Sequence, residues 1–339
     1  MAGGGRFPWE SLRLIPGRGL VAYVSRRLFS LGYEGIVKQH GKLRKRRSRE
    51  GDVSKDMVNE ILDNPGGFYS SLKGVRIPAT ILFSDIVGFT SLTENADPEA
   101  LVAQLNEYLS RMTGAVFENG GTLDKFIGDA VMAVWGNVRS QGPAADTKMA
   151  ARAALAMRRE LKILNASWFA RGIAPFAIGM GINQGDVLGG NIGSQEKADP
   201  TVIGDAVNLA SRLESLTRVY AVDILLGPTA AAMVRDEFHV RSVARVQVNG
   251  KSAPVEIATL IAERSAGIDP EFIRHLETYE ESFQKFRLRD FREARVLLFR
   301  FLEFYPNDFL ARMYLERTLE YETTPPDEEW NAVEVFKKK

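Results

Sequence analysis

Two acidic residues beside apolar stretches are the first candidates for chemistry. Asp85 lies near the end of a predicted strand over residues 77–86, and Asp129 lies in a Gly-Asp turn between predicted strands at 122–127 and 130–135. Taken singly, each is typical of a turn residue. If the strands pair, the two carboxylates converge at one edge of a sheet. Two hard oxygen ligands with free positions left over suit Mg²⁺ bound to substrate phosphates.

A second polar pair stands on a predicted helix, residues 206–216. Asn208 and Arg212 are four residues apart and therefore share one face of that helix. The plain interpretation is a surface Asn beside an Arg that pairs with Glu214 or Asp205. The functional interpretation is that the guanidinium, which stays charged and donates in a planar fork, stabilises negative charge on a phosphoryl group.

The elements that must position these residues predict an α+β fold. Their order, strand–helix–strand–strand–helix–strand with additions, is typical of a ferredoxin-like or palm-type antiparallel sheet with helices on one face. The predicted strands are residues 77–86, 122–127, 130–135, 176–182, 186–192, 223–226, 240–248 and 255–261, and the predicted helices are 97–118, 145–169 and 206–216. Residues 87–96 are predicted to be a loop, and residues 183–185 a break between two strands.

Four segments follow from composition and pattern. They are a weakly ordered lead-in (1–50), a short helix at 54–62 with its linker (51–76), the α+β domain (77–263) and a helical, aromatic tail (268–339). The tail resembles one helical hairpin of the tetratricopeptide kind. Because such repeats rarely bury a core alone, it is expected to dock on the main domain or on a partner.

Composition excludes several classes of protein. The chain has no Cys, which excludes disulfides, thiolate zinc sites and cysteine nucleophiles, and its three His leave little room for a histidine-based metal site. Residues 19–37 are the best membrane-spanning candidate, but Arg26 and Arg27 would lie at the middle of the bilayer. No secretory signal is recognisable, so the sequence predicts a soluble, cytoplasmic chain with no nucleic-acid partner. The lead-in carries a net charge of +9 and is either a solvated connector or the one segment able to touch anionic lipid.

Four motifs together resemble the catalytic domain of class III nucleotide cyclases. They are residues 83–90 (FSDIVGFT), 125–129 (KFIGD), 181–185 (GINQG) and 202–212 (VIGDAVNLASR), in the family's order and spacing. The resemblance covers residues 78–261, about half of the chain, and is greatest to bacterial adenylate cyclases of the branch that bears a Thr at the base-reading position. It implies conversion of ATP to cyclic AMP and pyrophosphate in intracellular signal transduction, with residues 54–62 as a coupling helix.

The resemblance also implies a role for each candidate residue. Asp85, Asp129 and the carbonyl of Ile86 would hold two Mg²⁺ or Mn²⁺ ions, Asn208 would orient the ribose, and Arg212 would stabilise charge at the α-phosphoryl group.

The remaining candidates are substrate contacts. Lys125 and Thr201 would read the base, since a donor beside an acceptor matches N1 and N6 of adenine and not guanine. The further candidates are Phe89, Thr90, Lys197 and Lys251, the last because Asn249 stands where the family often has a lysine. Backbone N–H groups of residues 88–91 are placed to approach phosphate oxygens.

A homodimer follows from the short distance in sequence between Lys125 and Asp129. One hairpin is poorly placed to serve both the base and the polyphosphate of the same ATP, so each site should take residues from two protomers. Two alternatives stay open. One is a catalytically weak or dead module that binds nucleotide for regulation, and the other is a guanylate cyclase.

Overall fold

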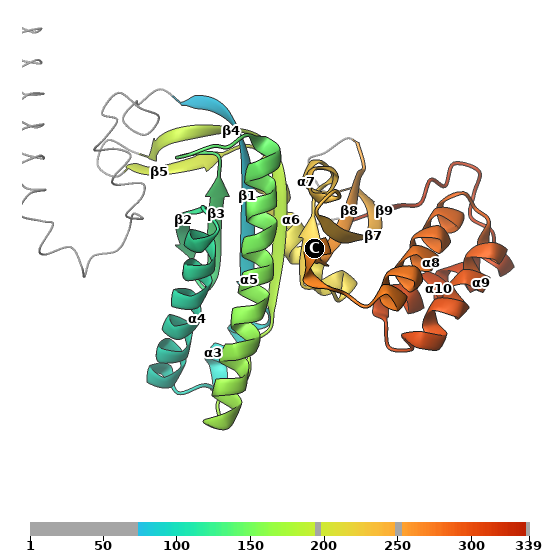
Figure 1. The fold of residues 1–339 in the computed structure, drawn as a ribbon, viewed down its shortest axis with the longest axis horizontal. Helices are drawn as coiled ribbons and strands as arrows, with labels where there is room; N and C mark the ends of the chain where they lie inside the picture. Colours follow the sequence, from blue (N-terminus) through green and yellow to red (C-terminus); the bar gives the residue numbers. More distant parts are fainter. Residues whose placement is uncertain (1–73, 194–197, 248–252, 337–339) are drawn as a thin grey trace, which may run out of the picture. The chain divides into compact units, whose positions relative to one another are not determined.

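One mixed β-sheet is the centre of the computed structural model, which describes residues 74–193, 198–247 and 253–336 (Figure 1). Its strands are β1 (Val75–Ile86), β2 (Thr122–Ile127), β3 (Ala130–Trp135), β4 (Ile178–Gly193), β5 (Ala198–Ile203), β6 (Ile224–Leu226), β7 (Phe238–Gln247), β8 (Val255–Glu263) and β9 (Val333–Val335). Within the described residues they form a single sheet in the order β2-β3-β1-β4-β6-β8-β7-β9, and β5 pairs with β4 beside this path. Neighbours are antiparallel except for β4–β6 and β7–β9.

The helices begin where the sequence supplies caps. They are α3 (Phe89–Asn95), α4 (Pro98–Glu118), α5 (Pro143–Ala170), α6 (Asp205–Tyr220), α7 (Pro228–Val234), α8 (Pro270–Arg287), α9 (Phe291–Phe304) and α10 (Phe309–Thr323). An Asp side chain accepts a hydrogen bond from a first-turn amide in four of them: Asp97, Asp269, Asp290 and Asp308. These caps satisfy amides that a helix leaves unpaired at its start, so local sequence fixes where each of these four helices begins.

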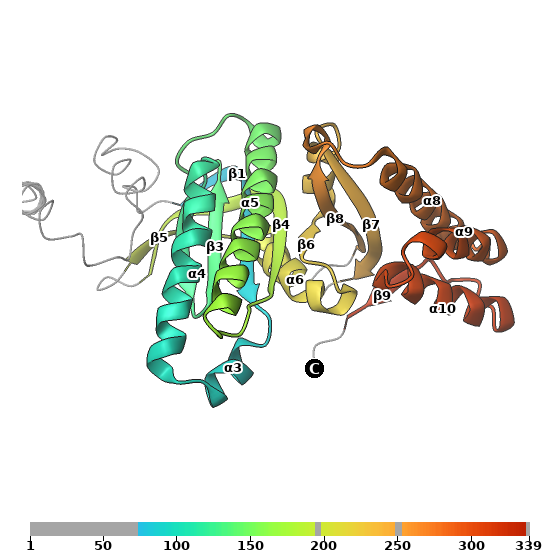
Figure 2. The ribbon, with the colours of Figure 1, turned by 60° about the horizontal axis from the view of Figure 1, so that its bottom comes forward.

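Alternate residues of β1 bury two opposite faces of the sheet. Leu82 and Ile86 lie in the apolar cluster that α4 and α5 cover, and Figure 2 shows these two helices side by side over the sheet. Ala79 and Ile81 face the other way and pack with the first turns of α6. The period of two is that of a strand buried on both sides, and the predicted α+β class is confirmed.

Two glycines let α6 lie directly against β4. A Cβ at Gly181 would collide with the Ala210 carbonyl and the Glu214 amide, and one at Gly179 would collide with the Thr217 hydroxyl. On the same face of β4, the buried side-chain amide of Asn183 donates to the Ala206 carbonyl at 3.0 Å. The helix that carries the candidate Asn and Arg is therefore positioned by the small residues of one strand.

The prediction of a break at residues 183–185 is wrong. Residues 178–189 of β4 pair without interruption with the whole of β1, from Ile178 opposite Ile86 to Gly189 opposite Val75. The turn preference of Asn-Gln-Gly is outweighed by pairing along the whole strand, because each residue inside the ladder satisfies backbone groups that a turn would leave unpaired. The strand continues to Gly193 in an arm that pairs with β5.

Residues 87–96, predicted to be a loop, instead contain α3. Gly88 adopts the left-handed conformation (φ 73°) just before it, and Leu92 donates its amide to the Gly88 carbonyl. Phe89 and Leu92, three residues apart, pack against the main core and stabilise this short helix. β5, α7 and β9 lie outside the predicted elements as well.

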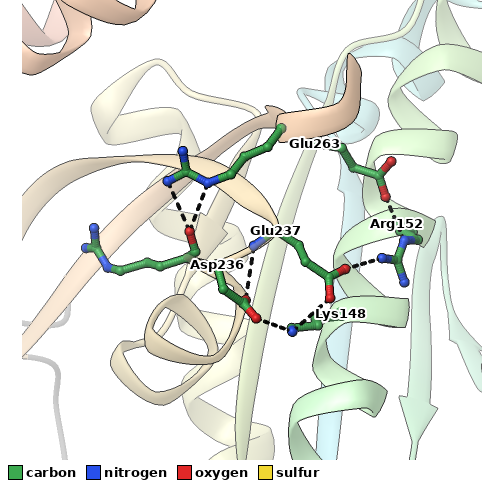
Figure 3. A network of polar contacts seen from close by, with 7 residues as sticks. Lys148, Arg152, Asp236, Glu237 and Glu263 are labelled. Carbon is green, nitrogen blue, oxygen red and sulfur yellow. Dashed lines mark hydrogen bonds and ion pairs between the residues drawn. The ribbon is translucent and has the colours of Figure 1, made fainter. Parts of the chain in front are cut away.

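Charged side chains join α5 to the far part of the sheet (Figure 3). Lys148 contacts Asp236 and Glu237, while Arg152 contacts Glu237 and Glu263. Asp236 and Glu237 lie between α7 and β7, and Glu263 ends β8, so this network joins α5 to the β7–β8 part of the sheet.

The helical tail docks on the outer part of the sheet. Arg241 of β7 forms a two-pronged ion pair with Asp308 at the start of α10, at 2.6 and 2.7 Å, and its guanidinium lies 3.6 Å from the centre of the Tyr279 ring. Aromatic residues of α8–α10, Phe283 and Tyr314 among them, share one buried cluster with α6 and β7. The expected docking of the tail on the main domain is thus observed, with a third helix and β9 added to the predicted hairpin.

The predicted lead-in (1–50) and coupling helix (54–62) lie outside the described residues. Among the helices that are described, none combines the length and apolarity needed to cross a bilayer.

Candidate active site

The two predicted metal-binding carboxylates lie next to each other. Pairing of β1 with β3 sets Ser84 opposite Val131, and this register brings Asp85 to the turn that holds Asp129. The Ile86 amide donates to Oδ2 of Asp129 at 3.2 Å. Neighbours on an antiparallel ladder are held by backbone hydrogen bonds, so the approach of the two carboxylates is built into the sheet.

The electrostatics of this pair show unfavourable crowding of negative charge. Burial and the adjoining Asp85 carboxyl raise the pKa of Asp129 to about 6. Burial also raises the pKa of Glu214 on α6 to about 7, against the opposing effect of Arg218, and Asp85 contributes to the rise. Arg218 donates to Asp85 at 2.7 Å and lies 3.1 Å from Glu214. The three carboxyl groups therefore favour a nearby positive charge, and Arg218 supplies part of it.

These residues fit a divalent cation that a substrate helps to bind. No group of three or more His, Cys, Asp or Glu able to hold a metal is found within the described ranges. Asp85 and Asp129 supply two carboxylates, which leaves most of a six-oxygen shell to phosphate oxygens and water. That division is the usual one for Mg²⁺ at a nucleotide site.

The helix α6 presents Asn208 and Arg212 as expected from their spacing. Asn208 is exposed, and Nη1 of Arg212 is buried without a hydrogen-bond partner among the described residues. The plain interpretation paired Arg212 with Glu214 or Asp205, and of these two Glu214 contacts Arg218, one turn further on. A buried guanidinium nitrogen without a partner is costly, and an anionic ligand would remove that cost.

The two predicted base-reading residues, Lys125 and Thr201, both contact the side chain of Asp124. Thr201 of β5 donates its hydroxyl to Oδ2 of Asp124 on β2 at 2.7 Å, and Nζ of Lys125 lies 3.5 Å from the same oxygen. Burial raises the pKa of Asp124, while Thr201 and Lys125 act to lower it. Thr201 is 6% exposed, whereas the Lys125 side chain is 37% exposed. The pair therefore shares one buried carboxylate oxygen.

The remaining candidates divide into described and undescribed residues. Phe89 is partly buried, with its ring edge-on against Phe176, and Thr90 is exposed at the start of α3. Lys197 and Lys251 lie outside the described residues, as does Asn249.

Three residues of the site were missed by sequence reasoning: Asp124, Glu214 and Arg218. Asp124 has a signal in the sequence, since two successive charges, Asp124 and Lys125, interrupt an otherwise apolar strand. Arg218 shares the helix face of Glu214 at four residues' spacing, but its contact with Asp85 depends on packing between α6 and β1.

Comparison with known proteins agrees with this geometry. Residues 76–262 match the family described as the adenylate and guanylate cyclase catalytic domain. Adenylate cyclase 1 of Rhizobium meliloti is 31% identical over 62% of this chain, and the adenylate cyclase of Anabaena cylindrica is 37% identical over 52%. These matches span 31% and 36% of the relatives, so the chain corresponds to about a third of their length. The crystal structure of the adenylyl cyclase CyaB from P. aeruginosa is 40% identical, with a TM-score of 0.54 over 57% of this chain and 98% of that one.

Proposed function

The chain belongs to the adenylate and guanylate cyclase family, and from that premise we propose that it converts ATP to 3′,5′-cyclic AMP and pyrophosphate. The observation that carries the proposal is the approach of Asp85 to Asp129, where burial and the adjoining Asp85 carboxyl raise the pKa of Asp129 and a bound cation would relieve the repulsion. The relatives from Rhizobium and Anabaena are adenylate cyclases.

Asp85, Asp129 and the Ile86 carbonyl would hold two Mg²⁺ or Mn²⁺ ions. When bound, these ions supply Lewis-acid chemistry that favours the ribose 3′-alkoxide and neutralises the departing pyrophosphate. The protein's part is to hold the two carboxylates at the ends of paired strands, where their positions are fixed before substrate arrives.

Two side chains of α6 act on the reacting part of the nucleotide. Asn208, which is exposed, orients the ribose through its amide. Arg212 donates to the α-phosphoryl oxygens, and its buried Nη1, unpaired among the described residues, supports this role. A guanidinium that is already desolvated interacts strongly with charge that grows during the reaction.

Lys125 and Thr201 would select adenine over guanine. Lys125 donates to N1, and Thr201 accepts from the N6 amino group. Their common contact with Asp124 supports a joint role. Phe89, Thr90, Lys197 and Lys251 are further proposed contacts of the nucleotide.

A homodimer would assemble each active site from two protomers. Exposed large apolar side chains on the β2–β3 hairpin and the β4–β5 arm support a second copy as the partner; they are Phe126, Ile127, Leu188, Ile192 and Ile203. Side chains of this kind gathered near a site commonly mark an interface. In this arrangement Asp85 and Asp129 of one protomer face the base-reading and α6 residues of the other.

The test is product formation by the purified full chain supplied with ATP or GTP and with Mg²⁺ or Mn²⁺. We expect cyclic AMP, loss of product when EDTA removes the metal, and a fall of at least about 100-fold in Asp129→Asn, which keeps the shape of the side chain. Faster turnover of GTP than of ATP would make the chain a guanylate cyclase. Absence of any product, from a protein that still binds ATP, would favour the regulatory module.

A further inference from the structure

An irregularity in β2 turns one carboxylate into the sheet beside the proposed base-reading residues. The ladder between β2 and β3 pairs Leu123 with Ala133 and Lys125 with Met132, so Asp124 is an extra residue without a partner in the ladder. Such a bulge changes the direction of a side chain and is common beside active sites. Its result here is a fully buried Asp124 side chain next to a partly exposed Lys125.

One oxygen of Asp124 contacts both base-reading residues. Oδ2 accepts the Thr201 hydroxyl proton at 2.7 Å, and the Lys125 ammonium lies 3.5 Å from it. Thr201 comes from the β4–β5 arm and Lys125 from the β2–β3 hairpin, so this contact also joins two parts of the chain that are far apart in sequence.

The contact decides how the Thr201 hydroxyl can be used. A hydroxyl has one proton and two lone pairs, and an ionised carboxylate can only accept. Once the proton is directed to Asp124, Thr201 offers only lone pairs to a ligand, while Lys125 offers only protons. The pair then shows one donor and one acceptor, which fits the N1 acceptor and N6 amino group of adenine. Guanine presents an N1–H donor and an O6 acceptor, the opposite pattern.

We propose that Asp124 is a positioning residue that sets purine specificity by holding Thr201 as an acceptor and Lys125 as its neighbouring donor. This inference rests on the proposed function for the identity of the site. It adds the residue that fixes Thr201 as the hydrogen-bond acceptor and Lys125 as the donor. Asp124 itself contacts no nucleotide.

The first test replaces Asp124 with Asn. Asparagine offers an NH₂ donor as well as an oxygen, so Thr201 is no longer held as an acceptor only, and its proton is free to point at O6 of guanine when the NH₂ faces it. We expect the ratio of kcat/KM for ATP to that for GTP to fall roughly tenfold, mostly through KM, the size expected for one reversed hydrogen bond. The matched control is Asp186→Asn, an exposed Asp on β4 that pairs loosely with Arg76 at 3.9 Å, and its ratio should equal that of the wild type.

A double-mutant cycle separates positioning from mere structural support. Thr201→Val removes the hydroxyl, so adding Asp124→Asn to it should change the ATP-to-GTP ratio no further. If Asp124→Asn proves unable to fold, Asp124→Ala, which removes the buried carboxylate altogether, should still relax the ratio. An unchanged ratio in folded Asp124→Ala, or equal effects with and without the Thr201 hydroxyl, would overturn the proposal.

Binding measurements keep this inference distinct from the proposed function. Fluorescent ATP and GTP analogues, measured with Ca²⁺ in place of the catalytic metal, report base preference without turnover. If the wild type makes no cyclic nucleotide but binds the ATP analogue more tightly than the GTP analogue, the proposed activity is refuted and the role of Asp124 is not. In that case Asp124→Asn must still reduce the preference for ATP in binding. A wild type that binds both nucleotides equally, or neither, refutes the role of Asp124.

Discussion

At the scale of single residues, the arginine on Asp85 is the feature with the clearest chemical consequence. Arg218 donates to the carboxylate proposed to hold a metal and also contacts Glu214. A cation fixed in the chain offsets charge repulsion in the free site, but it competes with any ion that must bind the same oxygen.

Arg218→Gln is therefore expected to reduce the Mn²⁺ concentration that gives half-maximal activity, by about two- to fivefold, the range for one partly exposed ion pair. Titration of activity with Mn²⁺ measures this. Arg159→Gln, an exposed arginine of α5, is the control and should leave the metal requirement unchanged. A higher metal requirement in Arg218→Gln would mean that the arginine assists binding instead.

Whether a site residue can be predicted from the sequence depends on how far apart in the chain it and its partner lie. Asp85, Asp129, Asn208 and Arg212 are identifiable because strand ends, turns and helix faces are local patterns. The contacts of Asp124 with Thr201 and of Arg218 with Asp85 are not, because these partners lie 77 and 133 residues away and meet only after the sheet has formed.

At the scale of elements, the close contact of α6 with β4 controls the position of the helix that carries Asn208 and Arg212. Gly181 faces backbone atoms of α6, which have no rotamer to change. The predicted elements are most accurate where a pattern is long, as in α4 and the β2–β3 hairpin. They fail at β4, where pairing with all of β1 outweighs a local turn signal.

Gly181→Ala is expected to destabilise the fold by about 1–3 kcal/mol, the range for overpacking. It should also lower activity by more than the loss of folded protein explains, because α6 carries Asn208 and Arg212. Thermal unfolding and specific activity together measure both effects. Gly114→Ala, in open space on α4, is the matched control and should be neutral or stabilising. Full activity in folded Gly181→Ala would show that α6 tolerates displacement.

At the scale of the whole molecule, the tail and the α+β domain behave as parts of one folded unit. The buried cluster that contains Phe283 and Tyr314 also contains Leu213 and Tyr220 of α6, so the tail supports the back of the same helix that faces the site. The sequence predicts the helical tail and its docking, but the partner surface is assembled from strands that only the full fold brings together.

Acid should weaken the docking of the tail through Asp308. Burial raises the pKa of Asp308, but the hydrogen bonds and charge of Arg241 outweigh it, so the folded pKa lies below its ordinary value of 3.8. A carboxyl with a depressed pKa stabilises the fold above its unfolded pKa and loses that contribution as pH falls through the folded pKa.

Below about pH 4, the wild-type free energy of unfolding should therefore fall more steeply than that of Asp308→Asn. The asparagine retains the cap on Ala311 but does not titrate. Urea unfolding at a series of pH values measures the two slopes, and parallel slopes would exclude Asp308 as the acid-sensitive group.

If each active site takes residues from two protomers, mixing two inactive variants should restore part of the activity. Asp85→Asn and Arg212→Ala should each be inactive, while a mixture that exchanges subunits should recover about a quarter of wild-type activity, from one intact site in half of the dimers. Mixing Asp85→Asn with Asp129→Asn is the control and should recover nothing, because both changes affect the same half of each site. Dimers that form without rescue in the first mixture would argue for sites within one protomer.

The last strand has a protective consequence. Val333–Val335 lies along β7 and occupies hydrogen-bonding positions that would otherwise run open along the rim of the sheet. Open rims of this kind recruit strands from other molecules and lead to aggregates. β9 covers this rim along Arg245–Gln247 of β7, while the β2–β3 hairpin with its exposed apolar side chains lies at the opposite edge of the sheet.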